Sequence, residues 1–302
     1  MAYHLHKHVR DDDRVRAAFN ALAGEVFGLS FEEWYRQGCW TDRYIPYLLL
    51  DGDRAAANVS VNRMETDWDG KRKHCIQLGT VMTAPAYRGR GLARMLMEEV
   101  LRDWLDRCDA LYLFANDTVL DFYPKFGFQR QAETQRRLLP SLLPAAAPQP
   151  LRRLDMELPA DRELLRACYQ RGNPHTRLPM LDNEGLLMFY CASFLRDHVF
   201  YLEDSQTAAI LEREEDALIC LDLYGGRNTP AETLPHLLSS LLQSLPDHWT
   251  AGAKELRLGF APAGEALGEA IPIGEDDALF VYAGKENPLS GWQGMFPLLS
   301  HA

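Results

Sequence analysis

The amino-acid sequence predicts an α+β fold, with a mixed β-sheet in each of two tandem domains. The chain has 302 residues, a length that is typical of two domains rather than one. Strand and helix patterns follow in the order strand, two helices, three strands, helix, strand, helix, strand, and these consecutive strands argue against a doubly wound parallel sheet. A similar order recurs after residue 153, so we expect a duplicated fold.

Local patterns indicate the elements of the first half. Carboxylates precede apolar residues at helical spacing from residue 11, and Ser30 is a typical cap for a second, short helix. Two apolar runs flank residues 51–53, which predicts a hairpin, and Pro124 is expected to end a short helix. The predicted strands lie within 3–9, 43–64, 67–82, 110–116 and 127–139, and the predicted helices within 11–28, 30–40, 83–105 and 118–126.

The second half repeats these patterns after a segment rich in Pro and Ala. We therefore divide the chain into a first domain at 1–140, a linker at 141–152 and a second domain at 153–302. In the second domain, Thr229 is expected to cap a helix that has Pro230 at its first position. Its predicted strands lie within 151–158, 198–225, 254–261 and 277–284, and its predicted helices within 160–172, 183–197 and 229–245.

Composition limits the class of protein and its partners. The formal net charge of -11 argues against nucleic acid or an anionic membrane as a partner and mildly favours a cationic substrate. No apolar run has the length of a membrane-spanning helix, and the polar start lacks the apolar core of a signal peptide. The cysteines occur singly in apolar segments, which is typical of buried free thiols in a reducing cytosol: Cys39, Cys75, Cys108, Cys168, Cys191 and Cys220. We therefore expect a cytoplasmic protein.

A turn with two glycines and two arginines, residues 88–91, precedes a strongly amphipathic helix. Glycine lets the backbone approach a ligand closely, and the first N–H groups of a helix bind anions. Arginines add cationic donors for the same anion. The turn therefore predicts a diphosphate site, although glycines that merely form a tight turn would leave the same pattern. A Walker sequence is absent, and Arg94 stands where a dinucleotide fingerprint has its third glycine.

A second motif, "FYPKFGF" at 122–128, follows about thirty residues later. Together the two motifs resemble the GNAT superfamily of acetyl-CoA-dependent N-acetyltransferases. The first matches its Arg/Gln-x-x-Gly-x-Gly/Ala pattern through Arg88, Gly91 and Ala93. The second matches through Phe122, Tyr123, Lys125, Gly127 and Phe128. The motifs cover residues 76–128, and the element order extends the resemblance to 1–140.

The resemblance implies residues that bind acetyl-CoA as co-substrate. Backbone groups at the end of a splayed strand would pair with the pantetheine arm, and an N–H there would polarise the thioester carbonyl. Asn116 would hydrogen-bond the same arm, and the role of the adjacent Asp117 is open. The implied strand residues are Val81, Met82 and Thr83, and the implied pyrophosphate residues are Arg88, Gly89, Arg90, Gly91, Leu92 and Ala93.

Tyr123 is implied as the general acid. A tyrosine positioned beside the leaving CoA thiolate can donate a proton to it, because the two groups have similar pKa values. The alternative is an aromatic core residue on a short helix. We expect Pro124 to restrict the backbone of Tyr123 without removing this role.

The acceptor side has less specific signals. Three carboxylates in the segment that borders the acceptor site of this family are candidate bases or surface residues: Glu32, Glu33 and Asp42. Four aromatic residues there could line a pocket or form core: Trp34, Tyr35, Trp40 and Tyr44. Three histidines alternate along the first strand, where an exposed face is expected rather than a metal site: His4, His6 and His8.

The second half lacks both motifs, and only a faint echo of the turn remains at Gly225, Gly226 and Arg227. It therefore resembles a degenerate GNAT-like domain that lost its cofactor and shapes the acceptor pocket or an oligomer interface. An active domain followed by a degenerate one also occurs in the Eis-like acetyltransferases. In that group the C-terminal carboxylate reaches the active site, which suggests such a role for Ala302.

The function that these observations predict is transfer of an acetyl group from acetyl-CoA to a primary amine in a ternary complex. The acceptor is expected to be a small molecule, with a cationic one mildly favoured by the net charge, and a homo-oligomer is left open. The alternatives are an acyl-CoA-binding sensor without catalysis and an interaction scaffold.

Overall fold

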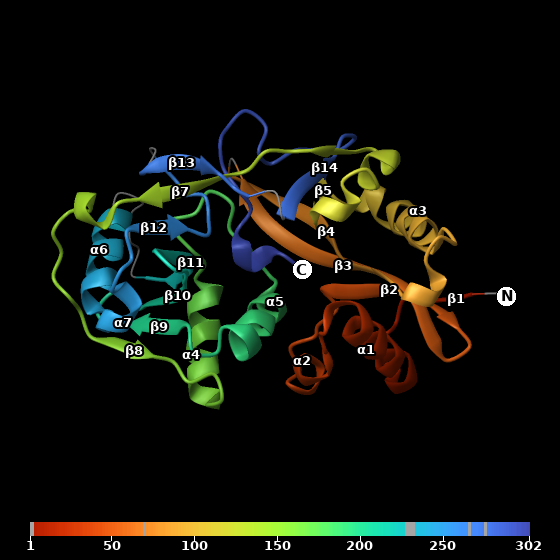
Figure 1. The fold of residues 1–302 in the computed structure, drawn as a ribbon. Coiled ribbons are helices and arrows are strands. Elements are labelled where there is room, and N and C mark those ends of the chain that lie inside the picture. Colours follow the sequence, from red (N-terminus) through yellow and green to blue (C-terminus); the bar gives the residue numbers. More distant parts are fainter. Residues whose placement is uncertain (1–2, 69, 227–232, 265–266, 275–276) are drawn as a thin grey trace.

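The computed structural model describes residues 3–68, 70–226, 233–264, 267–274 and 277–302. In this part of the chain the strands form two mixed sheets of seven strands each (Figure 1). The predicted α+β class and the repetition of a mixed sheet are confirmed. No helix among the described residues is long and apolar enough to cross a membrane.

The first sheet has the order β1-β2-β3-β4-β5-β14-β6. Its strands β4 and β5 run parallel, and the other neighbours within the described residues are antiparallel, as expected for a hairpin-rich mixed sheet. Its strands are β1 (His4–His6), β2 (Tyr44–Asp51), β3 (Arg54–Trp68), β4 (Lys71–Thr83), β5 (Ala110–Ala115), β6 (Phe128–Arg130) and β14 (Ala278–Tyr282).

Three helices cover this sheet: α1 (Asp13–Phe27), α2 (Glu32–Arg36) and α3 (Leu92–Trp104). The side chain of Asp12 accepts hydrogen bonds from the first turn of α1, and Gly28 ends the helix in the left-handed conformation. Both α1 and α3 pack against β3, and Figure 1 shows them on opposite sides of the sheet. The range predicted for α1 is right within two residues, whereas α2 and α3 occupy only parts of their predicted ranges, and the N-cap of α2 is Phe31 rather than the predicted Ser30.

The second sheet has the order β13-β7-β12-β11-β10-β9-β8. Its strands are β7 (Thr134–Leu138), β8 (Leu151–Arg153), β9 (Val199–Leu202), β10 (Thr207–Arg213), β11 (Ala217–Gly225), β12 (Glu255–Leu258) and β13 (Glu269–Pro272). Its helices are α4 (Pro159–Gln170), α5 (Glu184–Phe189), α6 (Leu234–Ser244) and α7 (Asp247–Thr250). A π-helical turn, Tyr190–Phe194, continues α5. The predicted Thr229 cap and Pro230 lie outside the described residues, and β13 was not predicted.

The two halves exchange strands. β7, from the first half, pairs with β12 and β13 of the second sheet, and β14, from the second half, lies between β5 and β6 of the first sheet. The predicted division of the chain at the linker 141–152 stays a prediction, but each sheet contains strands from both sides of this linker. Neither half therefore completes its own sheet.

The helix predicted within 118–126 is wrong in type. Two 3₁₀ turns occupy this stretch, Asp117–Val119 and Tyr123–Phe126. Pro124 lies in the first turn of the second 3₁₀ segment instead of ending a helix. A proline is tolerated there because the first N–H groups of a helix have no partner within it.

Candidate active site

The strands β4 and β5 pair over only part of their length. Their parallel pairing runs from Cys75 and Ala110 to Leu78 and Leu113. Beyond these pairs β4 continues to Thr83, next to β3, and β5 continues to Ala115, next to β14. The two neighbouring strands therefore separate at their carboxyl ends, which is where a ligand can enter the edge of a parallel pair.

A bulge in β4 marks the point of separation. The register against β3 shifts between Asn58 and Ser60, and Thr80 has a positive φ of 47°. The side-chain amide of Asn58 donates a hydrogen bond of 2.8 Å to the carbonyl oxygen of Thr80. The bulge is thus held by a buried polar contact, and it turns the backbone just before the predicted pantetheine residues.

The predicted pantetheine residues occupy the last part of β4. Thr83 pairs with Ala57 and Met82 with Asn58 on the β3 side. Met82 is buried, whereas Val81 and Thr83 are half-buried. The structure therefore brings all three to the strand end that directly precedes the glycine turn, on the side where β5 has left the strand.

The glycine turn is open and positively charged. Gly89 and Gly91 both have a φ of 76°, and a Cβ atom at either position would meet no atom within 4 Å. Gly91 precedes α3, whose N-terminus has no side-chain cap. Arg88 and Arg90 are exposed and donate hydrogen bonds to the main-chain oxygens of Thr83 and Ala86. This geometry fits a diphosphate, because the uncapped N-terminus of α3 follows open glycines that are flanked by exposed guanidinium groups.

Leu92 and Ala93 form the start of α3, where Leu92 is buried and anchors the turn to the core. Asn116 follows β5, and its amide oxygen accepts hydrogen bonds from the backbone and the hydroxyl of Thr118. Asp117 is exposed in the same turn. Asn116 therefore stands at the carboxyl end of β5, across the separation from the end of β4.

Tyr123 is buried in an aromatic cluster on the turn before β6. Its ring contacts Phe122, Phe128 and Phe280, with centroid distances of 5.2, 6.3 and 5.9 Å. Burial raises the pKa of Tyr123 to about 12. The phenol is protonated at neutral pH, as any tyrosine is, and the raised pKa makes it a weaker acid than a free tyrosine. Its catalytic role stays a prediction.

The last residue of the sequence given lies at the point of separation. A Cβ atom on Gly79 would be 1.9 Å from a main-chain oxygen of Ala302. The tail thus contacts β4 directly at the bulge, and Figure 1 shows the C-terminal end between the two halves. Sequence reasoning missed Gly79, although an isolated glycine within a strand is a known sign of close backbone approach.

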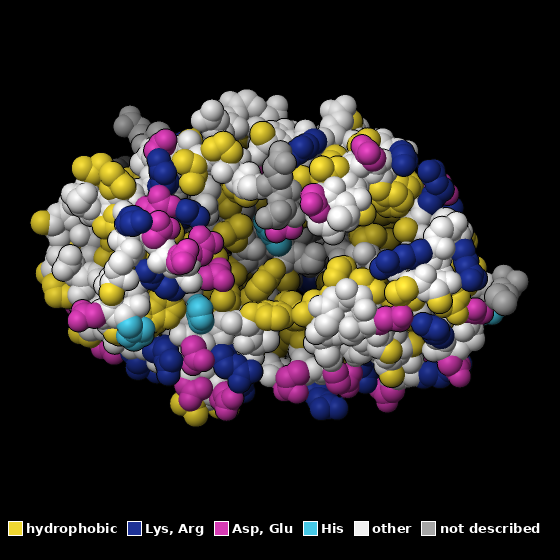
Figure 2. Space-filling model, viewed as in Figure 1, with side chains coloured by type: hydrophobic (Ala, Val, Ile, Leu, Met, Phe, Trp, Pro, Cys, Tyr) yellow, Lys and Arg dark blue, Asp and Glu magenta, His cyan; other side chains and the backbone are white. Residues whose placement is uncertain are grey.

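An apolar cavity of about 310 Å³ adjoins this contact. Thr80, His301 and Ala302 line one part of it. Most of the remaining wall is aromatic and comes from both halves: Phe31, Trp34, Tyr44, Phe189, Tyr190 and Phe194. Figure 2 shows hydrophobic side chains gathered where the molecule is hollowed between its halves, with charged side chains around them.

The four aromatic residues of the acceptor segment divide between pocket and core. Trp34 and Tyr44 line the cavity, whereas Trp40 is buried behind them and stacks on Trp34 at a centroid distance of 5.6 Å. Tyr35 stacks instead under the guanidinium of Arg16. Both readings of this segment were therefore partly right.

The three candidate bases do not line the apolar cavity. Glu32 forms ion pairs with Arg16 and Arg36, and Glu33 accepts a hydrogen bond from Gln37. Asp42 has a side chain that is 77% exposed and lies 3.8 Å from Arg63. A role for any of them as the general base stays a prediction.

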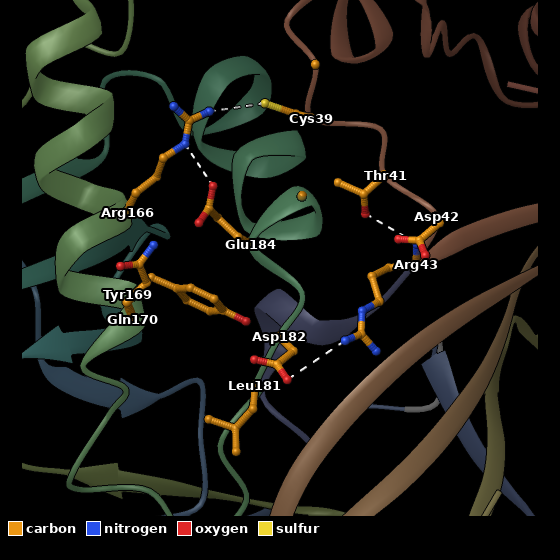
Figure 3. A pocket seen from close by; sticks show the side chains of 12 residues that line it. Cys39, Thr41, Asp42, Arg43, Arg166, Tyr169, Gln170, Leu181, Asp182 and Glu184 are labelled. Carbon is orange, nitrogen blue, oxygen red and sulfur yellow. Dashed lines mark hydrogen bonds and ion pairs between the residues drawn. The ribbon is translucent and has the colours of Figure 1, made fainter. Parts of the chain in front are cut away.

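A second cavity, of about 500 Å³, lies on the other side of the start of α5 and is charged (Figure 3). Arg166 reaches from α4 to Glu184 at 2.8 Å, and Arg43 lies 3.8 Å from Asp182. Asp42 also lines it. Two of its three carboxylates pair with the two guanidinium groups of the lining, whereas Asp42 lies 3.8 Å from Arg63, which is outside the lining.

The glycines described at the ends of β11 and β12 in the second half are closely packed, and the open ones with a positive φ elsewhere, Gly172 and Gly291, do not directly precede a helix. A Cβ atom at Gly225 would meet the carbonyl oxygen of Gln206 at 2.7 Å, and one at Gly259 would meet that of Leu221 at 2.5 Å. The chain after β12 therefore stays packed against β11 instead of separating from it. Gly226 has a φ of 96°, and Arg227 lies outside the described residues. This packing agrees with a degenerate domain that lacks the ligand space of the first.

Comparison with known proteins identifies the first domain. Residues 9–130 match the family model described as an acetyltransferase (GNAT) domain. A probable N-acyltransferase from Enterococcus faecalis V583 has a similar structure, with 13% identity, a TM-score of 0.59, and coverage of 93% of this chain and 72% of that one. A GCN5-related N-acetyltransferase from Anabaena variabilis has 17% identity, a TM-score of 0.58, and coverage of 93% and 72%.

Eis1 from Mycobacterium abscessus has 14% identity, a TM-score of 0.57, and coverage of 92% of this chain and 73% of that one. These likenesses extend over both halves and therefore include the tandem arrangement. Residues 9–130 therefore match the GNAT acetyltransferase family model, and the fold of both halves is similar to that of Eis1, with two mixed sheets of seven strands within the described residues.

Proposed function

We propose that the protein transfers an acetyl group from acetyl-CoA to a primary amine by direct attack in a ternary complex. Family membership supports acyl transfer in general. The observation that carries the finer proposal is the separation of β4 from β5 beside an open, cationic glycine turn. A diphosphate with a long amide-containing arm, as in acetyl-CoA, matches a strand edge followed by an anion site.

The residues of the first half would divide the work. Arg88, Gly89, Arg90, Gly91, Leu92 and Ala93 would hold the pyrophosphate, and the backbone of Val81, Met82 and Thr83 would hold the pantetheine arm together with Asn116. A backbone N–H of β4 would polarise the thioester carbonyl. As the amine nitrogen bonds to the carbonyl carbon, the carbon–sulfur bond breaks, and Tyr123 would donate a proton to the sulfur.

The burial of Tyr123 keeps the phenol protonated, but it also holds the ring among other aromatic side chains. Burial favours the neutral phenol, so the proton is present at pH 7. The residue must then be drawn from its aromatic cluster into contact with the sulfur when the ternary complex forms. The attacking amine loses its own proton to water or to a group of the tail around Ala302, which lies at Gly79.

Substitution of the proposed acid tests the proposal. Tyr123→Phe is expected to lower kcat by about 10²- to 10⁴-fold while leaving the Kd of acetyl-CoA unchanged, because the phenol would act only on the leaving group. Thiol release and calorimetric binding of acetyl-CoA are the two measurements. Tyr201→Phe, on β9 of the second sheet, is the matched control and is expected to keep full turnover. Undiminished turnover in Tyr123→Phe would refute the role.

The runner-up function is an acyl-CoA sensor without catalysis. One acetyl-CoA bound per chain, with CoA released on addition of an amine, would support the enzyme. Tight binding with no release over a broad amine panel would favour the sensor. Two bound molecules per chain would contradict the degenerate second domain.

A further inference from the structure

We propose that the apolar cavity takes as acceptor an amine that carries one aromatic or branched aliphatic group, and that it excludes polycations. This inference rests on the proposed function, because it names the acceptor class of the same site. The cavity reaches β4 at Thr80, between Gly79 and the predicted pantetheine residues. An acceptor held there would meet the thioester at the point where β4 and β5 separate.

No described side chain that lines the cavity is an acid or a strong base. Among the described residues that line it, none is Asp, Glu, Lys or Arg. Its one titratable imidazole, His301, has its pKa lowered to about 3 by loss of solvent, so it is neutral under ordinary conditions. The net charge of the chain therefore does not act inside this cavity. A second ammonium group placed there would be desolvated without a carboxylate side chain in the described lining to pair with, which is costly.

Polar groups gather at one end of the cavity. The hydroxyl groups of Tyr44 and Thr80 hydrogen-bond each other at 2.6 Å, and the hydroxyl of Tyr190 donates to the main-chain oxygen of His301 at 2.8 Å. A buried ring nitrogen of His301, Nε2, has no hydrogen-bond partner among the described residues. This end can hold a single amine head group, while the aromatic faces attract its partial or full positive charge. The rest of the wall suits only apolar groups.

Side-chain contacts between the two halves form the wall of the cavity. Phe189 of the second half stacks on Phe31 of the first at a centroid distance of 5.3 Å and meets Trp34 edge-on at 5.3 Å. The indole of Trp34 donates a hydrogen bond of 2.7 Å to the carbonyl oxygen of Gly185. Contacts between the halves therefore fix the wall, and its volume falls within the range of small-molecule pockets.

The cavity is also open to solvent at an apolar rim. Phe27 is 46% exposed and Phe194 is 55% exposed, although both are large aromatic residues. Exposed aromatic side chains beside a cavity indicate a binding site rather than core. An apolar group of the acceptor would cover them, which a flexible polycation cannot do.

An amine panel with acetyl-CoA as donor tests this class. We expect kcat/KM for 2-phenylethylamine to exceed that for 1,5-diaminopentane and for spermidine by roughly 100-fold or more, because discrimination against an unpaired buried charge is strong. Calorimetric binding of 2-phenylethanol, which has the phenyl group without the amine, is the second readout. Release of CoA with the polyamines in preference to 2-phenylethylamine would overturn the acceptor class and leave acetyl transfer standing.

Two further outcomes separate the inference from the proposed function. Binding of 2-phenylethanol and 2-phenylethylamine without any CoA release would support the ligand class and overturn acetyl transfer. Absence of binding and of release with every apolar amine would overturn the class itself.

A matched pair of variants places the ligand in the cavity. Phe194→Ala is expected to lower kcat/KM for 2-phenylethylamine roughly tenfold, since an apolar contact of this size is worth 1–3 kcal/mol. Leu158→Ala removes an apolar side chain of similar exposure, 52%, outside the cavity, and is expected to have no effect. Because both side chains are half-exposed, neither change should prevent folding. Equal behaviour of the two variants would contradict the proposed location.

Discussion

Replacing Gly79 by alanine tests whether the tail of the chain belongs to the reacting centre. The new methyl group would be 1.9 Å from a main-chain oxygen of Ala302 and 2.5 Å from its carbonyl carbon. Both are backbone atoms, so no side-chain rotation relieves the overlap. Gly79 itself is paired with Ser60 inside the sheet and has little freedom to move. The strain must therefore displace the tail.

The size of the displacement follows from the contact distance. Ordinary contacts of a Cβ atom begin at 3.4 Å, so the oxygen must retreat by about 1.5 Å from its 1.9 Å position. A misplacement of about 1 Å near the chemistry can cost about 10²-fold in rate. We therefore expect kcat to fall by roughly 10- to 100-fold. The Kd of acetyl-CoA should change little, because the glycine turn and α3 are untouched.

Thiol release, calorimetry with acetyl-CoA and thermal unfolding together separate these effects. Gly24→Ala is the control, because a Cβ atom there meets only a backbone oxygen at 3.8 Å and the residue lies within α1. It should keep full activity and gain about 0.4–1 kcal/mol of stability. Removal of residues 298–302 should lower kcat at least as much as Gly79→Ala. Full turnover in either the Gly79 variant or the shortened chain would refute a role for the tail.

The remaining predictions concern the glycine turn and a buried carboxyl group. Gly91→Ala should raise the Kd of CoA severalfold. An alanine in the left-handed conformation costs about 1–2 kcal/mol, and a backbone change that relieves this strain would turn the N–H groups of the turn away from the ligand. Gly28→Ala, at an equally left-handed position at the end of α1, should leave the Kd of CoA unchanged in the same titration. Burial raises the pKa of Glu133 from 4.5 to about 8. Between these pH values the folded state binds more protons than the unfolded state, so the free energy of unfolding falls as the pH rises from 4.5 through 8. The slope is at most about 1.4 kcal/mol per pH unit. Glu133→Gln should flatten this slope in urea unfolding between pH 6 and 8, and an unchanged slope would contradict the assignment.

The parts of the site that sequence could predict are those encoded by neighbouring residues. Gly89 and Gly91 have the left-handed backbone that the turn pattern implied, and the helix they precede begins at Leu92. The strand that ends at Thr83 was expected within one residue of that point. Such features depend on local dihedral preferences and apolar spacing, which a single sequence carries.

The acceptor side was not predictable because its parts are distant in sequence. Phe31 and Phe189 stack although they are 158 residues apart, and nothing local to either indicates the contact. The aromatic segment around Trp34 left pocket and core equally open, and only the docking of α5 decides between them. The expectation of a cationic acceptor came from net charge and stays a prediction, and net charge does not indicate which cavity an acceptor would enter.

The strand exchange explains why a domain without its own ligand space is still needed. β14 lies between β5 and β6, so it supports the turn that carries Tyr123, and Phe280 of β14 contacts the ring of Tyr123 directly. The second half also supplies the tail residue Ala302, which contacts Gly79 of the first half, and one wall of the apolar cavity. Removal of the second half would therefore take away the proposed acid's support, the tail and the acceptor wall together. Catalysis on this fold would be a property of the whole chain, even though the motifs that we propose to bind acetyl-CoA lie within its first 130 residues.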